Sequence, residues 1–456
     1  MPKTALAIAF ILFFALKASA QNVPNIVLYL TDDQSQADVS VYGAHLLRTP
    51  TADKLARAGL TFNNAFIASP ACAPSRAALL TGLMPARNGA EGNHTYPKPG
   101  TLILTRKLQE AGYKVLGFGK VAHGSMNEEC GYDFYSESKV NLYDNVIEYF
   151  KNNHSQQPIC LMVGDRRPHV PWTTDNLYDP SALKLPSSFI DTKETRQHWA
   201  QYYSDITGSD DEMGRVYQFA QEKFGNNFIF VFSSDHGGQW PFHKWNLYDR
   251  GIKVPLIVIW PGHVEPNTRT DAMVSWVDIF PTFLEIAKAK TLGNIDGQSF
   301  LNVLNGKSRR HRDHIYTTHS QDRKMNVYPM RSVRDERHKY IVNLLPDSYH
   351  SNHSDILRRP NSDAYWHSWD EAARTNPRAA EIVRKYQIRP PEEFYDLQKD
   401  PHEQINLIKD ESLQLKITKM RTMLETWMNE QGDTKRLSDD PYPITGPTPY
   451  QRQIKN

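Results

Sequence analysis

Five short, continuous apolar runs constrain the fold of this chain most strongly. They have the length of strands and little polar alternation, which is typical of strands buried on both faces of a parallel sheet. Helical patterns between them, such as 101–111 and 198–223, predict an α/β fold with a large, mostly parallel sheet flanked by helices. The runs are 25–30 (NIVLYL), 114–119 (KVLGFG), 159–164 (ICLMVG), 228–233 (FIFVFS) and 254–260 (VPLIVIW).

The first twenty residues have the composition of an export signal. Lys3 gives a positive start, residues 5–16 form an apolar stretch too short to span a bilayer, and Ala18-Ser19-Ala20 fits a small-residue cleavage site. The mature chain would begin near Gln21. No later segment of the sequence reaches the roughly 18 apolar residues of a membrane helix. We therefore expect an exported protein, periplasmic or secreted, or lysosomal if the host is eukaryotic.

The composition divides the rest of the chain into three parts. Residues 21–308 contain the buried runs and are expected to form the larger, N-terminal domain. Residues 309–431 are more polar, with shorter strand-like pieces and a helix near 413–431, which predicts a smaller α+β domain. Residues 432–456 are polar and rich in proline, so we expect an extended tail there.

Charge and cysteine content narrow the function. The formal net charge is only +2, which gives no indication of a nucleic-acid partner. Three cysteines are an odd number for an exported protein, so at least one thiol lacks an intramolecular partner. The context of Cys72 makes it the odd one. Cys130 and Cys160 could form a disulfide, and their spacing does not decide the matter.

Polar residues follow four of the buried runs directly. In open α/β sheets, ligands bind outside the carboxyl ends of the strands, so these groups are expected to converge on one site. They are Asp32 and Asp33, Lys120 with the nearby His123, His169, and Asp235 with His236. The three carboxylates form an oxygen-rich set, which suits Ca²⁺ or Mg²⁺ better than Zn²⁺.

Cys72 lies at the start of a predicted helix, next to Pro74-Ser75. An anion at that point meets free backbone N–H groups and the positive end of the helix dipole. Arg76 adds a guanidinium group one turn later. This environment favours a thiolate over a thiol.

The whole stretch 72–82 resembles the signature of a known family. Cys72-Ala73-Pro74-Ser75-Arg76, followed by Leu80-Thr81-Gly82, matches the type I sulfatase pattern C-x-P-S-R-x-x-x-L-T-G at every fixed position. The resemblance covers nearly the whole mature chain and implies the fold of the alkaline phosphatase superfamily. Its further motifs are the acidic pair after the first run, Gly119-Lys120, 168–171 (PHVP), 234–237 (SDHG), Lys244 and 392–407 (EEFYDLQKDPHEQINL).

This resemblance also implies the chemistry of the site. In the family the cysteine is oxidised after synthesis to formylglycine (3-oxoalanine), so Cys72 would be the precursor of the nucleophile and a maturase would be a partner. His169 or Lys244 would protonate the leaving group, and His123 would remove a proton afterwards. One Ca²⁺ per chain would be held by Asp32, Asp33, Asp235, His236 and Cys72. The implied catalytic set is Cys72, Arg76, Lys120, His123, His169 and Lys244.

Two sets of residues resemble different subfamilies, and the first set consists of two departures from the plainest family pattern. The spacing GKVAH before His123 and the pair Asp235-His236 resemble the iduronate-2-sulfatase branch. The segments AEGNHTYP, SWDEAA and RPPEEFYDL resemble bacterial relatives of heparan N-sulfatase (sulfamidase). Candidates for binding an anionic sugar are His94, Arg166, Arg167 and His243.

The sequence therefore predicts an exported sulfatase that acts on a sulfated polysaccharide or its oligosaccharides. It does not identify the glycan, and it leaves O-sulfate and N-sulfate open. Two alternatives remain: a phosphate or phosphonate ester hydrolase of the same superfamily, and a secreted glycan-binding protein without turnover.

Overall fold

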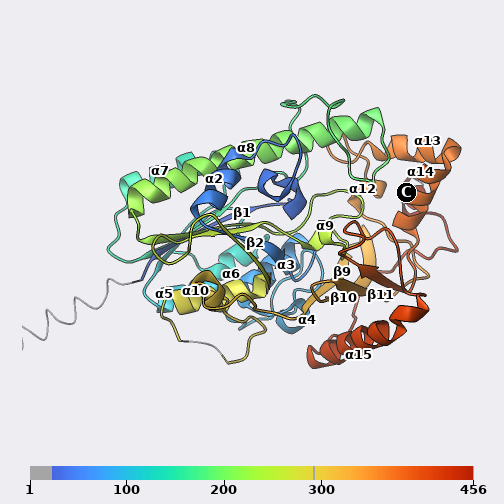
Figure 1. Ribbon diagram of the computed structural model, residues 1–456. Helices are drawn as coiled ribbons and strands as arrows, with labels where there is room; N and C mark the ends of the chain where they lie inside the picture. Colours follow the sequence, from blue (N-terminus) through green and yellow to red (C-terminus); the bar gives the residue numbers. More distant parts are fainter. Residues whose placement is uncertain (1–22, 291–292, 455–456) are drawn as a thin grey trace, which may run out of the picture.

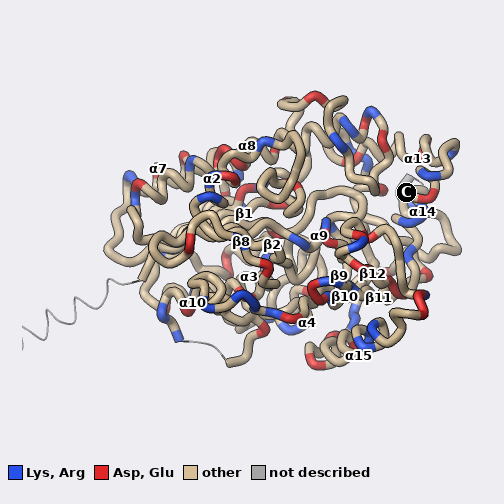
Figure 2. The backbone as a smooth tube through the Cα atoms, viewed as in Figure 1, with Lys and Arg blue, Asp and Glu red and all other residues tan. Residues whose placement is uncertain are grey.

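The computed structural model describes residues 23–290 and 293–454. The predicted export signal, residues 1–20, lies outside them. Within this part of the chain, no helix is both long and apolar enough to cross a membrane. Figure 1 shows two regions of unequal size, and Figure 2 shows acidic and basic residues interspersed over both of them.

A large sheet has the strand order β4-β3-β5-β1-β6-β7-β2-β8. Its strands are β1 (Asn25–Thr31), β2 (Leu60–Phe66), β3 (Lys114–Gly119), β4 (Phe134–Ser136), β5 (Ile159–Gly164), β6 (Phe228–Ser234), β7 (Leu256–Ile259) and β8 (Thr268–Ser275). All neighbouring pairs from β4 to β6 are parallel, whereas β7 is antiparallel to both β6 and β2. The predicted α/β class with a mostly parallel sheet is confirmed.

The described helices flank this sheet and the smaller one. They are α2 (Pro50–Ala58), α3 (Cys72–Thr81), α4 (Pro85–Asn88), α5 (Leu104–Glu110), α6 (Met126–Cys130), α7 (Leu142–Asn152), α8 (Lys193–Phe224), α9 (Asp249–Ile252), α10 (Ile279–Ile286), α11 (Leu301–Leu304), α12 (His353–Ile356), α13 (Trp366–Thr375), α14 (Pro377–Gln387), α15 (Gln414–Glu430) and α16 (Pro449–Ile454). Figure 1 shows α2, α7 and α8 on one face of the large sheet, and α3, α5 and α10 on the other.

The central strand β1 explains why both faces are covered. The side chains of Ile26, Leu28 and Leu30 pack with residues of α3, α5 and α10. Val27 and Tyr29 point the other way and pack with residues of α2, α7 and α8. Because successive side chains of a strand alternate between faces, a continuous apolar run requires an apolar layer on each side. The run thus becomes a strand at the centre of a three-layer arrangement.

A second sheet forms the core of the smaller region. It is antiparallel, with the order β12-β11-β10-β9, and its strands are β9 (Ile315–Asp322), β10 (Asn326–Arg334), β11 (His338–Asn343) and β12 (Glu392–Asp396). Helix α15 covers one face, where Ile417 and Leu424 pack with Val333, Tyr340 and Phe394. The predicted smaller α+β part and its late helix are confirmed.

The polar tail is held against the rest of the chain by hydrogen bonds. The Asp433 carboxylate accepts a hydrogen bond from Nη2 of Arg331 at 3.0 Å, and the Ser438 amide donates to Oε1 of Gln321 at 2.8 Å. The tail also contains the short helix α16, which the sequence did not predict. Its polar composition fits this mode of attachment, because the contacts are hydrogen bonds and an ion pair.

The two remaining cysteines are not bonded to each other. Cys130 and Cys160 are both free and fully buried. Burial raises the pKa of Cys130 to about 12 and raises that of Cys160 above its ordinary value. Both thiols are therefore inert structural groups at neutral pH.

The ion pair between Arg331 and Asp433 predicts a measurable effect on stability. Each side chain is 1% exposed, so Arg331→Met leaves a carboxylate in a water-poor site. Breaking such a pair costs about 3–5 kcal/mol, and we expect the lower end because the tail can carry Asp433 into water. Urea unfolding should show this loss, and limited proteolysis should cleave the tail of the variant faster. A loss below about 1 kcal/mol, as for an exposed pair, would contradict the proposed attachment.

Candidate active site

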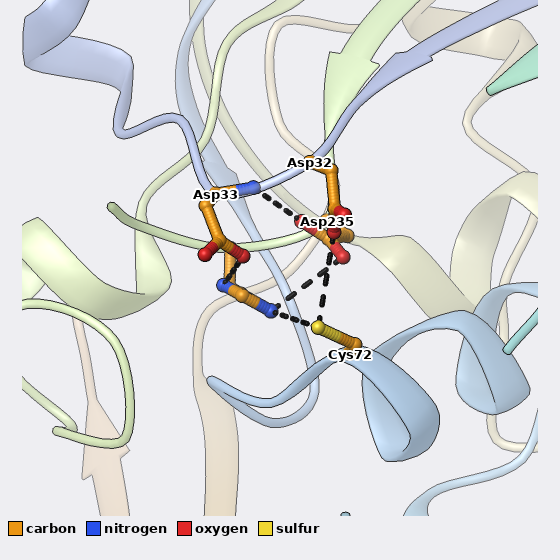
Figure 3. A group of neighbouring side chains, drawn as sticks. Asp32, Asp33, Cys72 and Asp235 are labelled. Carbon is orange, nitrogen blue, oxygen red and sulfur yellow. Dashed lines mark hydrogen bonds and ion pairs between the residues drawn. The ribbon is translucent and has the colours of Figure 1, made fainter. Parts of the chain in front are cut away.

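The site lies at the carboxyl ends of the parallel strands. Asp32 and Asp33 follow β1, and Asp235 and His236 follow its neighbour β6. Helix α3 brings Cys72 to the same place. One ligand atom from each of these five residues lies within 4.8 Å of all the others, and all five side chains are buried. Figure 3 shows the three carboxyl groups gathered around the sulfur of Cys72.

The backbone at Asp33 turns both consecutive carboxylates into the site. Asp33 has a φ of 71°, in the left-handed region that a non-glycine residue seldom adopts. Its amide donates a hydrogen bond to Oδ1 of Asp235 at 3.0 Å, which joins the loops after β1 and β6. Two neighbouring residues that would point apart in a strand can therefore both face the same centre.

Cys72 is the first residue of α3, so its sulfur lies at the amino end of the helix. The sulfur is 3.3 Å from Nε2 of His236 and 3.5 Å from the Nζ atoms of both Lys120 and Lys244. Burial alone would raise the pKa of the Cys72 thiol, but the two ammonium groups lower it below its ordinary value. The position favours a negatively charged atom.

Arg76, one turn along α3, cross-links the loops of the site. It is fully buried, and its Nε and Nη2 atoms donate to Asp235 at 3.0 Å and to Asp32 at 3.2 Å. Its Nη1 atom donates to the carbonyl oxygens of Lys120 and Val121. Every donor group of this side chain is thus directed at a loop that carries a predicted site residue.

Lys120 emerges where two strands approach closely. A Cβ atom on Gly164 would lie 2.1 Å from the carbonyl oxygen of Lys120, and one on Gly119 (φ 70°) would lie 2.3 Å from that of Gly164. Glycine is therefore required at both positions. The ammonium group of Lys120 contacts Asp32, and that of Lys244 contacts both carboxylate oxygens of Asp33, at 2.8 and 2.9 Å.

The carboxylates of the cluster titrate very differently. Burial would raise the pKa of Asp32 and of Asp33, but Lys120 and Lys244, respectively, hold it below its ordinary value. Burial and the charge of Asp32 raise the pKa of Asp235 to about 7. Burial would lower the pKa of His236, but Asp235 raises it to about 9. Asp235 and His236 together therefore hold a proton near neutral pH, which a cation bound among the carboxylates would displace.

The donor set fits a divalent cation. It offers three carboxylates with an imidazole and a sulfur, so hard oxygen ligands dominate. The carboxylates also gain from a cation because each is removed from water. The residues present are therefore able to hold the metal ion that the sequence predicts at this point.

A cavity of about 370 Å³ opens above Cys72. Besides Cys72, it is lined by five residues that the sequence singles out, namely His94, His123, Arg166, His169 and Lys244. It is also lined by residues that the sequence analysis missed, among them Gln239, Trp245, Asp322, His353 and Arg359. Asp322, His353 and Arg359 come from the C-terminal part of the chain, and no local pattern marks them. Only the tertiary fold brings them to the cavity.

A chain of polar contacts runs through two histidines of the cavity wall. Nε2 of His123 is 2.9 Å from Nδ1 of His94, and Nε2 of His94 is 3.6 Å from Oδ1 of Asp322. Oδ2 of Asp322 accepts hydrogen bonds from Asn93 at 2.8 Å and Trp245 at 2.9 Å. Burial lowers the pKa of His123 to about 3 and that of His94 to about 4, so both rings are neutral at pH 7.

His169 has one ring nitrogen engaged and one available. Its Nδ1 is 2.6 Å from the carbonyl oxygen of Val170, so in the neutral ring Nδ1 carries the hydrogen. Nε2 then carries the lone pair. Burial lowers the pKa of His169 to about 3. The ring is therefore fixed in one tautomer by the backbone.

The structure does not support a substrate contact for His243. The side chain is fully buried and packs on Phe189, with ring centroids 5.3 Å apart, outside the residues that line the cavity. His243 precedes Lys244 in the sequence, but the two side chains point to different environments. The structure therefore does not bring His243 to the cavity, because sequence proximity to a site residue does not fix side-chain direction.

Arg167 is likewise not brought to the catalytic cavity. Its Nε and Nη2 atoms donate to the two oxygens of Asp165, at 3.0 and 2.6 Å, and it does not line the cavity above Cys72. The guanidinium charge is thus balanced inside the protein. Its neighbour Arg166 does line the cavity, so its predicted role in anion binding stays a prediction.

Comparison with known proteins identifies the family. The Sulfatase family model matches residues 24–289, and the model for the C-terminal part of N-sulphoglucosamine sulphohydrolase matches residues 236–356. An ulvan-active sulfatase of Formosa agariphila is 30% identical over 429 residues, covering 90% of this chain and 81% of the relative. Human N-sulphoglucosamine sulphohydrolase is 27% identical, and the match covers 90% of this chain and 91% of the human protein. The chain belongs to the sulfatase family and is an enzyme of the sulfuric ester hydrolase class.

Solved structures share the fold. A 2-O glycosaminoglycan sulfatase superimposes with a TM-score of 0.69 at 20% identity, covering 95% of this chain and 100% of the other. A protein solved in complex with D-glucosamine-2-N,6-O-disulfate superimposes with a TM-score of 0.68 at 19% identity. The match covers 91% of this chain and 99% of the other. A phosphonate monoester hydrolase from Silicibacter pomeroyi superimposes with a TM-score of 0.69 at 17% identity. The match covers 90% of this chain and 96% of the other.

The carboxylate cluster predicts that a divalent cation stabilises the fold. A ligand at 100 times its dissociation constant adds about 2.7 kcal/mol to the free energy of unfolding. Chelation should therefore lower the melting temperature, and added Ca²⁺ or Mg²⁺ should restore it. Asp33→Asn should reduce both the bound metal, measured by elemental analysis, and this metal-dependent shift. Asp175→Asn, on an exposed side chain, is the matched control. An undiminished shift in Asp33→Asn would remove Asp33 from the metal site.

Proposed function

We propose that this protein is an exported sulfatase that removes sulfate from a sulfated polysaccharide or its oligosaccharides. It would use formylglycine derived from Cys72 and one bound Ca²⁺. The observation that carries the proposal is the position of Cys72, which lies within the C-x-P-S-R motif, at the floor of a cavity and among three carboxylates and two ammonium groups. Sulfate release from a panel of defined sulfated oligosaccharides is the direct test.

The relatives support a sulfated glycan as the substrate class. Their names include ulvan-active sulfatase, N-sulphoglucosamine sulphohydrolase and N-acetylgalactosamine-6-sulfatase. A cavity of about 370 Å³ falls in the range of small-molecule sites and suits a sugar unit. These names cover both O-sulfate and N-sulfate, so both kinds belong in the panel. Sequencing the amino terminus of exported protein tests the start near Gln21.

The metal would be held by Asp32, Asp33, Asp235 and His236, next to residue 72. When bound, Ca²⁺ supplies a Lewis acid that polarises sulfate oxygens and favours an ionised nucleophile. Arg76 keeps Asp32 and Asp235 in position through its two charged hydrogen bonds. It does not line the cavity, so its role is to hold the ligands rather than to contact the sugar.

Formylglycine would supply a hydrated aldehyde with two hydroxyl groups, one to attack sulfur and one to allow sulfate to leave. Lys120 and Lys244 each place an ammonium group 3.5 Å from the sulfur of Cys72, whose position a hydroxyl oxygen would take. Both would donate charged hydrogen bonds to that oxygen, and Lys244, which lines the cavity, would also donate to the sulfate. The position that favours a thiolate would thus favour an alkoxide.

His169 is our candidate for the acid that protonates the leaving sugar. Burial opposes the charged form of Lys244, but Asp33 raises its pKa above the ordinary value, so Lys244 keeps its proton and acts as a hydrogen-bond donor. His169 lines the cavity and has Nε2 available. The negative charge of a bound sulfate ester would raise its pKa and bring a proton to Nε2.

His123 would take a proton from the second hydroxyl group, so that its oxygen forms the C=O bond of the aldehyde again while the C–O bond to the sulfate group breaks and sulfate leaves with the electron pair. Its partner His94 faces Asp322 through Nε2, and a nitrogen lone pair directed at a carboxylate would be repelled, so Nε2 of His94 carries the hydrogen. Nδ1 of His94 then accepts from Nε2 of His123. This leaves the lone pair of His123 on Nδ1, which has no hydrogen-bond partner among the described residues. We therefore assign His94 to orienting His123.

Hydrolysis of phosphonate or phosphate esters is the second candidate. The fold similarity to a phosphonate monoester hydrolase is as close as that to a glycosaminoglycan sulfatase. Assays with matched aryl sulfate, phosphonate and phosphate esters separate these activities. The third possibility, glycan binding without turnover, would require binding by mature, metal-loaded protein that releases no sulfate.

The role of Cys72 predicts a chemical modification. Protein made in a host with a formylglycine-generating maturase should yield a tryptic peptide in which residue 72 carries an aldehyde, detected by mass spectrometry. Cys72→Ala should fold, because alanine fits the start of a helix, but should lose turnover. Substantial sulfatase activity in Cys72→Ala would contradict the mechanism.

The contacts of Lys244 predict a kinetic effect. Lys244→Met keeps most of the stem but removes the charge, and a lost transition-state donor costs about 2.7–4 kcal/mol. We expect turnover on a sugar sulfate to fall on the order of a hundredfold in metal-saturated protein. Lys244→Arg should rescue only in part, because its fork replaces a compact donor. Unchanged turnover in Lys244→Met would leave leaving-group departure to His169 alone.

A further inference from the structure

A second cavity adjoins the catalytic one. It has a volume of about 290 Å³ and shares Arg166, His169 and Pro171 with the cavity above Cys72. Its far wall is formed by Lys139 and the residues that follow it, between β4 and α7. The two hollows therefore lie next to each other, with these three residues common to both.

The accessible charges of this second cavity are positive. Arg166 donates to the carbonyl oxygen of Val170 at 2.7 Å, and no carboxylate among the described residues pairs with it. Lys139 is exposed and likewise forms no ion pair within the described part of the chain. Arg167 also lines the cavity, but Asp165 balances its charge.

The two acidic groups of the wall are engaged within the protein. Asp205 is 9% exposed and accepts a hydrogen bond from the Thr173 amide at 3.0 Å. Glu212 is 6% exposed, accepts from the Tyr143 amide at 2.7 Å and pairs with Arg215. The groups left free to meet a ligand are thus the cations Arg166 and Lys139.

The loop that carries Lys139 is held in place. The hydroxyl of Ser138 and the side-chain amide of Asn145 both donate to the carbonyl oxygen of Val140, at 3.0 and 3.1 Å. Asn141 adopts a positive φ of 51° and precedes the first residue of α7. The position of Lys139 is therefore set by the turn around it.

His169 lines both cavities, so its proposed role indicates which sugar unit would lie in each. If His169 protonates the leaving oxygen, the sugar that bore the sulfate lies beside it. The next unit of a glycan chain would then continue past the residues common to both cavities into the second cavity. A neutral sugar would leave two cations without partners, whereas a negatively charged substituent would pair with them.

We propose that the second cavity is a subsite for the sugar unit next to the sulfated one, and that it selects a unit with an anionic group, a carboxylate or a further sulfate. This proposal rests on the proposed function. It makes the enzyme selective for polyanionic chains rather than for sulfated sugars in general.

Binding can be measured without turnover in the Cys72→Ala variant. The probes are disaccharides from heparin and from ulvan in which a sulfated sugar is linked to a uronate, together with their carboxyl-reduced forms. Calorimetry should show the uronate form binding about tenfold more tightly, because each partly exposed ion pair contributes up to about fivefold. The difference should shrink at 0.5 M NaCl as salt screens the charges, the Debye length being about 3–8 Å between roughly 1 M and 0.15 M salt.

Lys139→Met in the same background should lose about fivefold of this preference. Lys151→Met is the matched control, because it removes an exposed charge from α7 outside the cavity. Equal affinity of the Cys72→Ala protein for the uronate and the carboxyl-reduced disaccharide would overturn the subsite. An unchanged preference after adding Lys139→Met would do the same. Sulfate release from a sulfated monosaccharide by mature parent enzyme tests the proposed function separately, so failure there with retained charge preference would leave the subsite standing.

Discussion

The pairing of Arg76 with Asp32 and Asp235 is the interaction on which the rest of the site depends. All three side chains are fully buried, so water does not solvate any of these charges. Removing one member of such a group costs about 3–5 kcal/mol, since its partner is left unpaired. Because Arg76 and Cys72 share helix α3, the same bonds that join the loops after β1 and β6 also fix the position of residue 72.

The parallel sheet makes this arrangement possible. Strands β3, β5, β1 and β6 are neighbours and all run in the same direction, so their carboxyl ends deliver polar residues to one edge. The apolar layers on both faces provide the stability that offsets the cost of assembling buried charges there. The C-terminal part of the chain then contributes another side of the cavity, with Asp322 at the end of β9 and His353 at the start of α12.

Sequence reasoning succeeded where chemistry is local and failed where it depends on the tertiary fold. Uninterrupted apolar runs predicted five strands, but β2 was missed because Asn63 and Asn64 interrupt its apolar pattern. The antiparallel direction of β7 could not be predicted either, since an apolar run carries no information on strand direction. Motif spacing indicated Cys72 and the acidic pairs, whereas Asp322 and His353 have no local signal. His243 is next to Lys244 in the sequence, but its side chain does not line the cavity.

The charges of the site also bear on which ester it accepts. The three carboxylates of the cluster face three fixed cations, Arg76, Lys120 and Lys244, so these charges cancel. A metal ion bound to His236 would keep its ring neutral. A divalent cation would then bring two positive charges. A sulfate monoester carries one negative charge and an ionised nucleophile adds another, which together balance the cation. A phosphate monoester dianion would leave an excess negative charge in a buried site, where Coulomb interactions are weakly screened. With a divalent cation bound, the site would thus match singly charged esters, such as sulfates and phosphonate monoesters, better than dianionic phosphates.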